Sequence, residues 1–289
     1  MRYGLLGTGP WATNAHGPAL AAHPDAELVG VWGRRPEAAA SLAETLGARA
    51  YADVDELFAD VDAVAIALPP HIQAPLAVRA ARAGCHLLLD KPVATTVEAA
   101  REVAEAAEQA GVASVVFFTL RFAAESAAWV EEQSAVEGWF TARADWLGSV
   151  FSSGDSPFAD SPWRREKGAL WDVGPHALSM LLPVLGDVTD LTAAPGPGDT
   201  VHLILRHTGG ASSTAALSLT TPAPGSGVTV ELRGTAGVST LPDRTDGVTA
   251  AFRNAVDALA EAARTGKAHP CDARFGLRVT ELLASAESA

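Results

Sequence analysis

The sequence predicts an α/β protein with an N-terminal, doubly wound parallel sheet and a C-terminal α+β domain whose sheet is mostly antiparallel. In the first 118 residues, short apolar runs alternate with longer Ala-rich amphipathic runs, which is typical of strands joined by crossover helices. A glycine-rich segment at residues 7–12 links the first two runs. Beyond residue 119, apolar runs follow one another closely, as in antiparallel sheets. We therefore expect two domains, residues 1–119 and 120–289.

The N-terminal elements follow from the composition of each run. The strands are almost entirely apolar, as expected where helices cover both faces of a sheet, and lie at Tyr3–Leu6, Glu27–Trp32, Ala63–Leu68, His86–Leu89 and Ala113–Phe118. The helices between them are expected at Trp11–Ala22, Glu37–Leu46, Ile72–Ala83 and Val97–Ala110. Strand–helix–strand repetition implies parallel strands with right-handed crossovers.

The C-terminal part has a different rhythm. A helix at Arg121–Gln133 precedes a strand at Trp139–Trp146, a loop at 152–162 and a helix that begins near Pro175. Alternating strands are then expected at Val201–His207, Ser212–Leu219 and Val228–Arg233, followed by helices at Thr249–Arg264 and Arg274–Ser285. Strands this close together in sequence favour antiparallel pairing.

Composition excludes several classes of protein. The formal net charge of -13 argues against a nucleic-acid surface, which needs a basic stripe. No apolar run is long enough for a membrane span, and the start runs directly into a strand, so we expect a cytoplasmic protein without a signal peptide. The two cysteines form no disulfide framework. No metal site is expected, because no ligand spacing links His16, His23, His202, His207 and His269.

The segment Gly7-Thr8-Gly9-Pro10-Trp11-Ala12 fits the pattern G-x-G-x-x-G/A between a strand and a helix. Gly7 permits a tight turn, Gly9 lets the backbone approach a pyrophosphate, and Ala12 permits close packing of helix on strand. The helix N-terminus adds N–H donors and partial positive charge. A plain strand–helix turn is the alternative. We interpret residues 1–119 as a dinucleotide-binding Rossmann domain and residues 120–289 as the substrate-binding and oligomerisation domain.

The end of the second strand bears on the choice of cofactor. NAD-binding domains usually carry an acid here, which binds the ribose 2′-hydroxyl. This chain has Gly33, followed by Arg34 and Arg35. A small residue leaves room, and guanidinium groups suit a 2′-phosphate, so we predict NADP, with NAD as the alternative. The arginines could instead stack on adenine or be surface charges.

A charged pair, Asp90-Lys91, ends a buried apolar strand and is followed by Pro92. Ligands of open α/β sheets bind outside the carboxyl ends of the strands, so all three residues are expected at the cofactor. A lysine there can stabilise charge that develops on a substrate oxygen. The chain has only three lysines, which favours a function for Lys91 over a surface pair with Asp90.

Asp172 and His176 are four residues apart and can converge. Because Pro175 suits only a first helical turn, we expect Asp172 on the turn that enters a helix and His176 in its first turn. A histidine there can exchange a proton near neutral pH. The alternative is a helix cap and a buried structural histidine.

Taken together, several separated motifs resemble the Gfo/Idh/MocA family, named for glucose–fructose oxidoreductase, inositol dehydrogenase and a rhizopine catabolism protein. Besides the glycine loop they are Leu68-Pro69-Pro70-His71, Ala83-Gly84-Cys85-His86, Asp90-Lys91-Pro92, Arg121-Phe122, Trp163-Arg164 and the segment from Gly168 to His176. The family more often has Glu at Asp90, Asn at Thr119 and an acid at Ser179. The last two departures weaken the expectation of the usual polyol contacts.

The resemblance implies a role for each matched residue. Lys91 would be the electrostatic catalyst, His176 the proton donor or acceptor, and Asp172 its orienting partner and a substrate ligand. The substrate cleft would be lined by Arg121, Trp163 and Arg164. The cofactor would be bordered by Leu68, Pro69 and His71.

The leading hypothesis is therefore an NAD(P)-dependent dehydrogenase or reductase of a small hydroxyl- or carbonyl-bearing molecule, such as a sugar or cyclitol. The C-terminal sheet is a candidate for homo-oligomer contacts. One alternative is a redox-inactive dinucleotide-binding regulator, motivated by Thr119 and Ser179. Another is reduction of a C=C or C=N bond on the same fold.

Overall fold

The computed structural model describes residues 1–154 and 156–289, and residue 155, within the predicted loop 152–162, lies outside the described residues. The described residues form two compact units, and neither is one continuous stretch of chain. The first unit comprises residues 1–123 and 246–278, and the second comprises residues 124–245 and 279–289.

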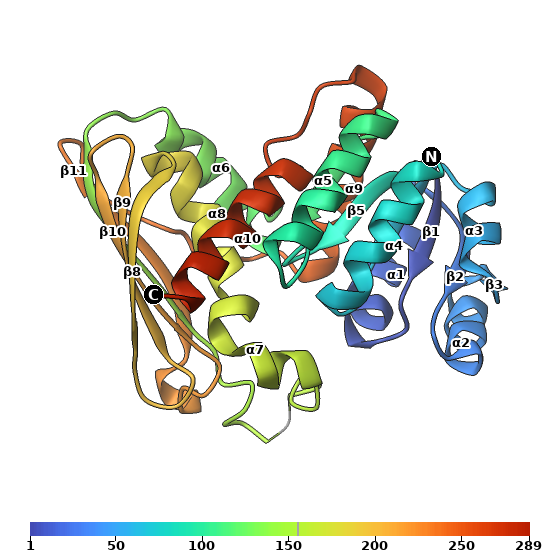
Figure 1. Ribbon diagram of the computed structural model, residues 1–289, viewed down its shortest axis with the longest axis horizontal. Coiled ribbons are helices and arrows are strands. Elements are labelled where there is room, and N and C mark those ends of the chain that lie inside the picture. Colours follow the sequence, from blue (N-terminus) through green and yellow to red (C-terminus); the bar gives the residue numbers. More distant parts are fainter. Residues whose placement is uncertain (155) are drawn as a thin grey trace. The chain divides into compact units, whose positions relative to one another are not determined.

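The first unit is built on a parallel sheet with the strand order β3-β2-β1-β4-β5-β6 (Figure 1). The strands are β1 (Arg2–Leu6), β2 (Glu27–Trp32), β3 (Arg49–Tyr51), β4 (Ala63–Ile66), β5 (His86–Asp90) and β6 (Ser114–Phe117). The helices that follow them are η1 (Ala12–His16), α1 (Gly17–Ala21), α2 (Pro36–Leu46), α3 (Val54–Asp60), α4 (Pro70–Arg82), α5 (Val97–Ala110) and η2 (Thr119–Arg121). This is the doubly wound Rossmann order, as the sequence predicts.

Two elements of this unit, a strand and the helix that follows it, were not predicted from the sequence. Strand β3 has three residues, of which only Tyr51 is buried, so it carries no apolar run. Helix α3 follows directly, and its N-cap Asp53 accepts a hydrogen bond from the backbone N–H of Asp55. Together they supply the edge strand that pairs in parallel with β2.

The predicted helix at Trp11–Ala22 is interrupted. Residues Ala12–His16 form a π-turn, closed by the Gly17 N–H bonded to the Ala12 carbonyl, and α1 continues from there. The turn buries the His16 imidazole completely. Its ring stacks on Phe252 at a centroid distance of 4.0 Å and meets Phe117 edge-on at 5.9 Å. Neither ring nitrogen has a hydrogen-bond partner among the described residues.

Residues 246–278 belong to the first unit, which differs from the single boundary expected near residue 119. Helix α9 (Val248–Thr265) contacts β5, β6 and α1. The Val116 N–H of edge strand β6 donates to the Cys271 carbonyl at 2.7 Å. Local patterning predicts the helix correctly but does not reveal which surface its apolar face covers.

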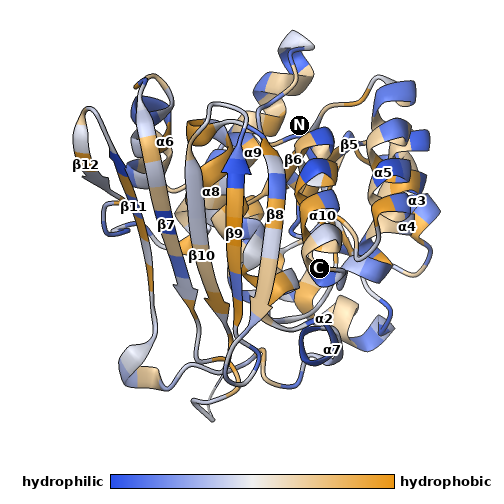
Figure 2. Cartoon of the chain, turned by 60° about the vertical axis from the view of Figure 1, so that its left-hand side comes forward, coloured by the Kyte–Doolittle hydropathy of each residue, from blue (hydrophilic) through white to orange (hydrophobic). Residues whose placement is uncertain are grey.

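The second unit is built on a mixed, mostly antiparallel sheet with the order β12-β11-β7-β10-β9-β8, in which only the β7–β10 pair is parallel among the described strands. Its strands are β7 (Trp139–Leu147), β8 (Val188–Pro195), β9 (Val201–His207), β10 (Ser212–Ser218), β11 (Gly227–Gly234) and β12 (Gly237–Thr240). Its other elements are α6 (Ala124–Ser134), α7 (Pro162–Asp172), α8 (Gly174–Leu185), η3 (Ala223–Gly225) and the end of α10 (Ala273–Glu287). In Figure 2, α6 and α8 lie behind the sheet, whose open face mixes polar and apolar residues.

Helix α7 and the edge strands β8 and β12 were not expected from the sequence. Helix α7 is interrupted at Gly168, where φ is 63°, so no continuous amphipathic pattern crosses it. The edge strands are short or largely exposed and rich in Thr, Ala and Ser. Within the described residues, no helix is both long and apolar enough to cross a membrane.

The burial of His16 predicts a specific acid sensitivity. Burial lowers the pKa of His16 to about 3, whereas an exposed histidine in the unfolded chain titrates near its ordinary value of 6.5. Between these values the unfolded chain binds a proton that the folded chain excludes. The free energy of unfolding should therefore fall by about 1.4 kcal/mol per pH unit from this residue as the pH drops below 6.5.

Urea unfolding at pH 7 and pH 4.5 measures this effect. His16→Phe keeps the ring stack. Between the two pH values its free energy of unfolding should fall by roughly 2–3 kcal/mol less than that of the wild type. His71→Phe, at an exposed position, is the matched control and should leave the difference unchanged. If wild type and His16→Phe lose the same free energy of unfolding between pH 7 and pH 4.5, the folded protein does not keep the imidazole unprotonated.

Candidate active site

The glycine loop follows β1, and its two glycines differ in their surroundings. Gly7 has a φ of 128°, and a Cβ there would lie 2.4 Å from the Ala67 carbonyl oxygen, so only glycine fits. A Cβ at Gly9 would meet nothing within 4 Å. Gly7 is required by the turn itself, whereas Gly9 leaves the loop surface open at the position where a pyrophosphate would approach. Ala12 is fully buried behind the loop.

The end of β2 lies against this loop. A Cβ at Gly33 would lie 2.7 Å from the Thr8 Cγ2 methyl, so an acidic side chain cannot be added at Gly33 unless Thr8 moves. Arg34 and Arg35 follow and are exposed. Neither guanidinium forms an ion pair or hydrogen bond with another described residue, which leaves both side chains available to an anion.

The predicted residues of the next two strands lie at the same edge. Leu68 and Pro69 follow β4, and Pro69 caps α4, in whose first turn His71 is exposed. Asp90 ends β5, which pairs in parallel with β4. Because β1, β4 and β5 are parallel neighbours, their carboxyl ends and the residues that follow them collect at one edge of the sheet.

A buried glutamine holds the segment around Lys91. The Gln73 side chain is fully buried, and its Nε2 donates to the Asp90 carbonyl at 2.7 Å and to the Pro92 carbonyl at 3.1 Å. Its Oε1 accepts from the Asp90 N–H at 2.9 Å. The Lys91 N–H donates to the Asp90 carboxylate at 2.8 Å, and the Lys91–Pro92 peptide bond is cis. Gln73 was missed from the sequence, where its one signal is a polar residue on the apolar face of α4.

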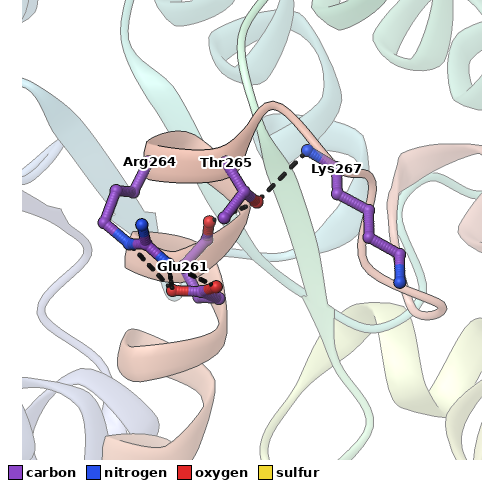
Figure 3. Close-up of polar contacts among 4 residues, drawn as sticks. All are labelled: Glu261, Arg264, Thr265 and Lys267. Carbon is purple, nitrogen blue, oxygen red and sulfur yellow. Dashed lines mark hydrogen bonds and ion pairs between the residues drawn. The ribbon is translucent and has the colours of Figure 1, made fainter.

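The three lysines have very different environments. Lys267 is exposed on the loop after α9, where its N–H donates to Thr265 Oγ1 beside the Glu261–Arg264 ion pair (Figure 3). Lys167 pairs with Glu287 at 3.0 Å. Lys91 is only 8% exposed, at the carboxyl end of β5. Lys91 is therefore the one lysine that the fold buries, and it does so where ligands of such sheets bind.

In the second unit, Asp172 is held by a buried arginine. The Arg164 Nε lies 3.1 Å from Asp172 Oδ2, with side chains 11% and 8% exposed. The guanidinium also lies 4.8 Å from the Trp163 ring centre and 4.9 Å from the Phe158 ring centre. Removing one partner of a buried ion pair leaves the other charge uncompensated, so Arg164 is needed to hold Asp172 in place.

His176 lies in the first turn of α8, as expected from the sequence. Asp172 is the last residue of α7 just before it, whereas a turn was expected there. The imidazole stacks on Trp146 of β7, with ring centroids 5.1 Å apart and ring planes 8° from parallel. Ser179 is buried, and its hydroxyl donates to the His176 carbonyl at 2.7 Å. Trp146 was not identified from the sequence, because it is thirty positions away on another element.

Each unit thus gathers part of the predicted set. The first unit holds the glycine loop, Gly33 to Arg35, Leu68 to His71, Asp90 to Pro92, and Arg121, whose charge adds to burial in lowering the pKa of His269. The second unit holds Trp163, Arg164, Asp172 and His176. Among the described residues, no three His, Cys, Asp or Glu side chains gather as metal ligands do.

Comparison with protein families gives matches in both units. Residues 1–118 match the model described as an oxidoreductase family with an NAD-binding Rossmann fold. Residues 146–240 match the GFO/IDH/MocA C-terminal domain.

The curated relatives include enzymes of sugar metabolism. The dTDP-3,4-didehydro-2,6-dideoxy-alpha-D-glucose 3-reductase of Streptomyces violaceoruber is 31% identical over 207 residues, which are 70% of this chain and 59% of that protein. The D-glucoside 3-dehydrogenase of Escherichia coli (strain K12) is 31% identical over 193 residues, 64% of this chain and 54% of that protein. The matches therefore span little more than half the length of these relatives.

Solved structures share the fold over the whole chain. An oxidoreductase domain protein from Kribbella flavida has a TM-score of 0.88 at 22% identity, covering 99% of this chain and 96% of that one. Levoglucosan dehydrogenase in complex with NADH and levoglucosan has a TM-score of 0.85 at 20% identity, covering 100% of this chain and 97% of that one. At these identities the likeness shows the fold alone.

The buried hydrogen bonds of Gln73 predict a large cost for its removal. Gln73→Leu leaves the carbonyls of Asp90 and Pro92 and the N–H of Asp90 without their partner in a buried place. We expect the free energy of unfolding to fall by roughly 2–4 kcal/mol in urea titrations, because each unsatisfied buried polar group costs about 1–3 kcal/mol. Gln109→Leu, on the exposed face of α5, is the control and should change little. Equal stabilities of the two variants would contradict the assignment.

Proposed function

Since this chain is a member of the GFO/IDH/MocA oxidoreductase family, we propose that it transfers a hydride between NAD(P) and a small hydroxyl- or carbonyl-bearing substrate, a sugar, cyclitol or related compound. The observation that carries the proposal is the buried Lys91 at the carboxyl end of β5, on the same sheet edge as the open glycine loop. The sugar dehydrogenases and reductases among its relatives support the substrate class.

Two observations support NADP(H) as the preferred cofactor, with NAD(H) as the alternative. Position 33 carries a glycine in place of the acid that usually binds the ribose 2′-hydroxyl, and the Thr8 methyl occupies the space that an acid there would need. The exposed Arg34 and Arg35 offer guanidinium donors suited to a 2′-phosphate. The pyrophosphate would lie on the backbone N–H groups around Gly9, at the start of the following helix.

The proposed chemistry divides between the two units. A bound nicotinamide ring supplies or accepts the hydride. Lys91 donates to the substrate oxygen and stabilises the negative charge that develops on it. His176 gives or takes the hydroxyl proton, which a carbonyl–alcohol interconversion requires. Asp172, held by Arg164, orients the imidazole or a substrate hydroxyl.

We further propose that Arg121, Trp163 and Arg164 contribute to the substrate cleft, Arg164 mainly by fixing Asp172. Residues 1–119 would carry the cofactor and residues 120–289 most of the substrate site. The open face of the second sheet, on which Ile204 is 56% exposed, would carry homo-oligomer contacts. The two buried free cysteines are in keeping with a reducing, cytoplasmic setting.

Two substitutions test the catalytic proposal. Lys91→Ala and His176→Ala should each lower turnover at least about 100-fold, because general acid–base catalysis and charge stabilisation each contribute that much. Turnover is followed by NADPH absorbance with myo-inositol, levoglucosan and glucose 6-phosphate as candidate substrates. NADP(H) binding, measured by thermal shift, should survive in both variants. Undiminished turnover in either variant would remove that residue from the mechanism.

The proposed cofactor preference is tested at the arginines. Arg34→Ala and Arg35→Ala should raise the Kd of NADPH about tenfold or more, because each loses hydrogen bonds to a charged phosphate, and should leave the Kd of NADH unchanged. Isothermal titration calorimetry measures both constants.

The exposed Arg82 on α4 provides the control substitution to Ala. Conversely, Gly33→Asp combined with Thr8→Ser removes the methyl clash and should shift preference toward NADH. If the arginine variants lose affinity for NADH and NADPH by the same factor, the 2′-phosphate assignment is wrong.

A further inference from the structure

We infer that Trp146 is a positioning residue that fixes the ring plane of His176, an inference that rests on the proposed role of His176 in proton transfer. The two rings are stacked at 5.1 Å between centroids and are 8° from parallel. Aromatic rings attract one another at such distances in offset-stacked arrangements, so the indole favours one orientation of the imidazole.

The strand register of the second sheet places Trp146 on the face that contacts His176. Trp146 pairs across β10 with Leu217 and across β11 with Val228, and the fully buried Leu217 marks this as the face that α8 covers. Gly174 begins α8, and a Cβ there would lie 2.9 Å from Leu283 and 3.3 Å from Leu217. The missing side chain lets the first turn of α8 lie close against the strand next to β7. His176, two residues later, then meets Trp146.

The backbone of His176 is also fixed. Its N–H donates to the Val173 carbonyl at 3.1 Å, and its carbonyl accepts from the Ser179 hydroxyl at 2.7 Å. The imidazole can still turn about two bonds: Cα–Cβ, which a helix confines to staggered rotamers, and Cβ–Cγ, a torsion with a broad, roughly two-fold preference. Rotation of the ring would break the near-parallel stack on the indole. Trp146 therefore acts on the Cβ–Cγ torsion, which has the broader preference of the two.

The ring plane matters because an imidazole donates and accepts protons in that plane, at the ring edge. The indole covers one face of the imidazole, and the ring nitrogens lie at the edge, where Nδ1 is buried. A fixed plane therefore fixes the direction in which His176 transfers a proton. Small misplacements of a reacting group can cost on the order of 100-fold in rate, so orientation should appear in kcat.

The test compares Trp146→Leu, which removes the ring, with Trp146→Phe, which retains one. The substrate for this test is whichever of myo-inositol, levoglucosan and glucose 6-phosphate gives the highest turnover. Trp146→Leu should lower its kcat roughly 10- to 100-fold, while the KM for NADPH stays within about twofold. Trp146→Phe should recover most of kcat. Trp139→Leu, on the same strand but hydrogen-bonded to the Gln133 carbonyl, is the matched control and should retain kcat. In a His176→Ala background, Trp146→Leu should have no further effect.

A second readout does not need turnover. The indole ring current should shift the His176 ring protons upfield in the NMR spectrum, and Trp146→Leu should remove this shift while thermal unfolding and NADPH binding show a folded protein. Wild-type kcat in Trp146→Leu, an unshifted His176 ring, or a further loss in the His176→Ala background would each overturn the inference. Wild-type protein that binds NADPH but turns over no substrate overturns the proposed function itself, and the catalytic role of Trp146 with it.

Discussion

Parallel pairing of β1 between β2 and β4 is the constraint on which the rest of the structure depends. Parallel strands bring their carboxyl ends to one edge, so the glycine loop, Gly33 and the segment of Lys91 meet there although they are spread over residues 7 to 92 of the sequence. Strict packing at Gly7 meets the needs of the fold, and open space at Gly9 leaves room for the proposed cofactor. Every proposed role of the first unit follows from that edge.

The groups proposed for chemistry are each positioned by neighbouring residues to which no proton or charge transfer is assigned. Gln73 fixes the backbone on both sides of Lys91 from within α4. Arg164 fixes Asp172, and Trp146 stacks on His176. A buried charge or a rotatable ring is useful only if its position is fixed beforehand, because reorganisation during a reaction adds to the barrier. These holding residues are as much a part of the site as the groups they hold.

Much of the fold could be predicted from local pattern, because the apolar strands and the helix at Val97–Ala110 carry clear periodicity. Short or interrupted elements could not, as β3 and the kink at Gly168 show. The sequence did not show that α9 belongs to the first unit, because periodicity identifies an apolar face but not the surface against which it packs. The motif residues could be proposed from the sequence because they are adjacent along the chain, whereas Gln73 and Trp146 emerged only from three-dimensional contacts.

We propose that Lys91 of the first unit and His176 of the second act on the same substrate atom. A crystal structure of the chain with NADPH and a bound polyol tests it directly. We expect Lys91 Nζ and a ring nitrogen of His176 to lie within hydrogen-bond distance of one substrate oxygen, beside the nicotinamide ring. A complex in which either group is remote from that oxygen would show that the two residues do not share the reaction.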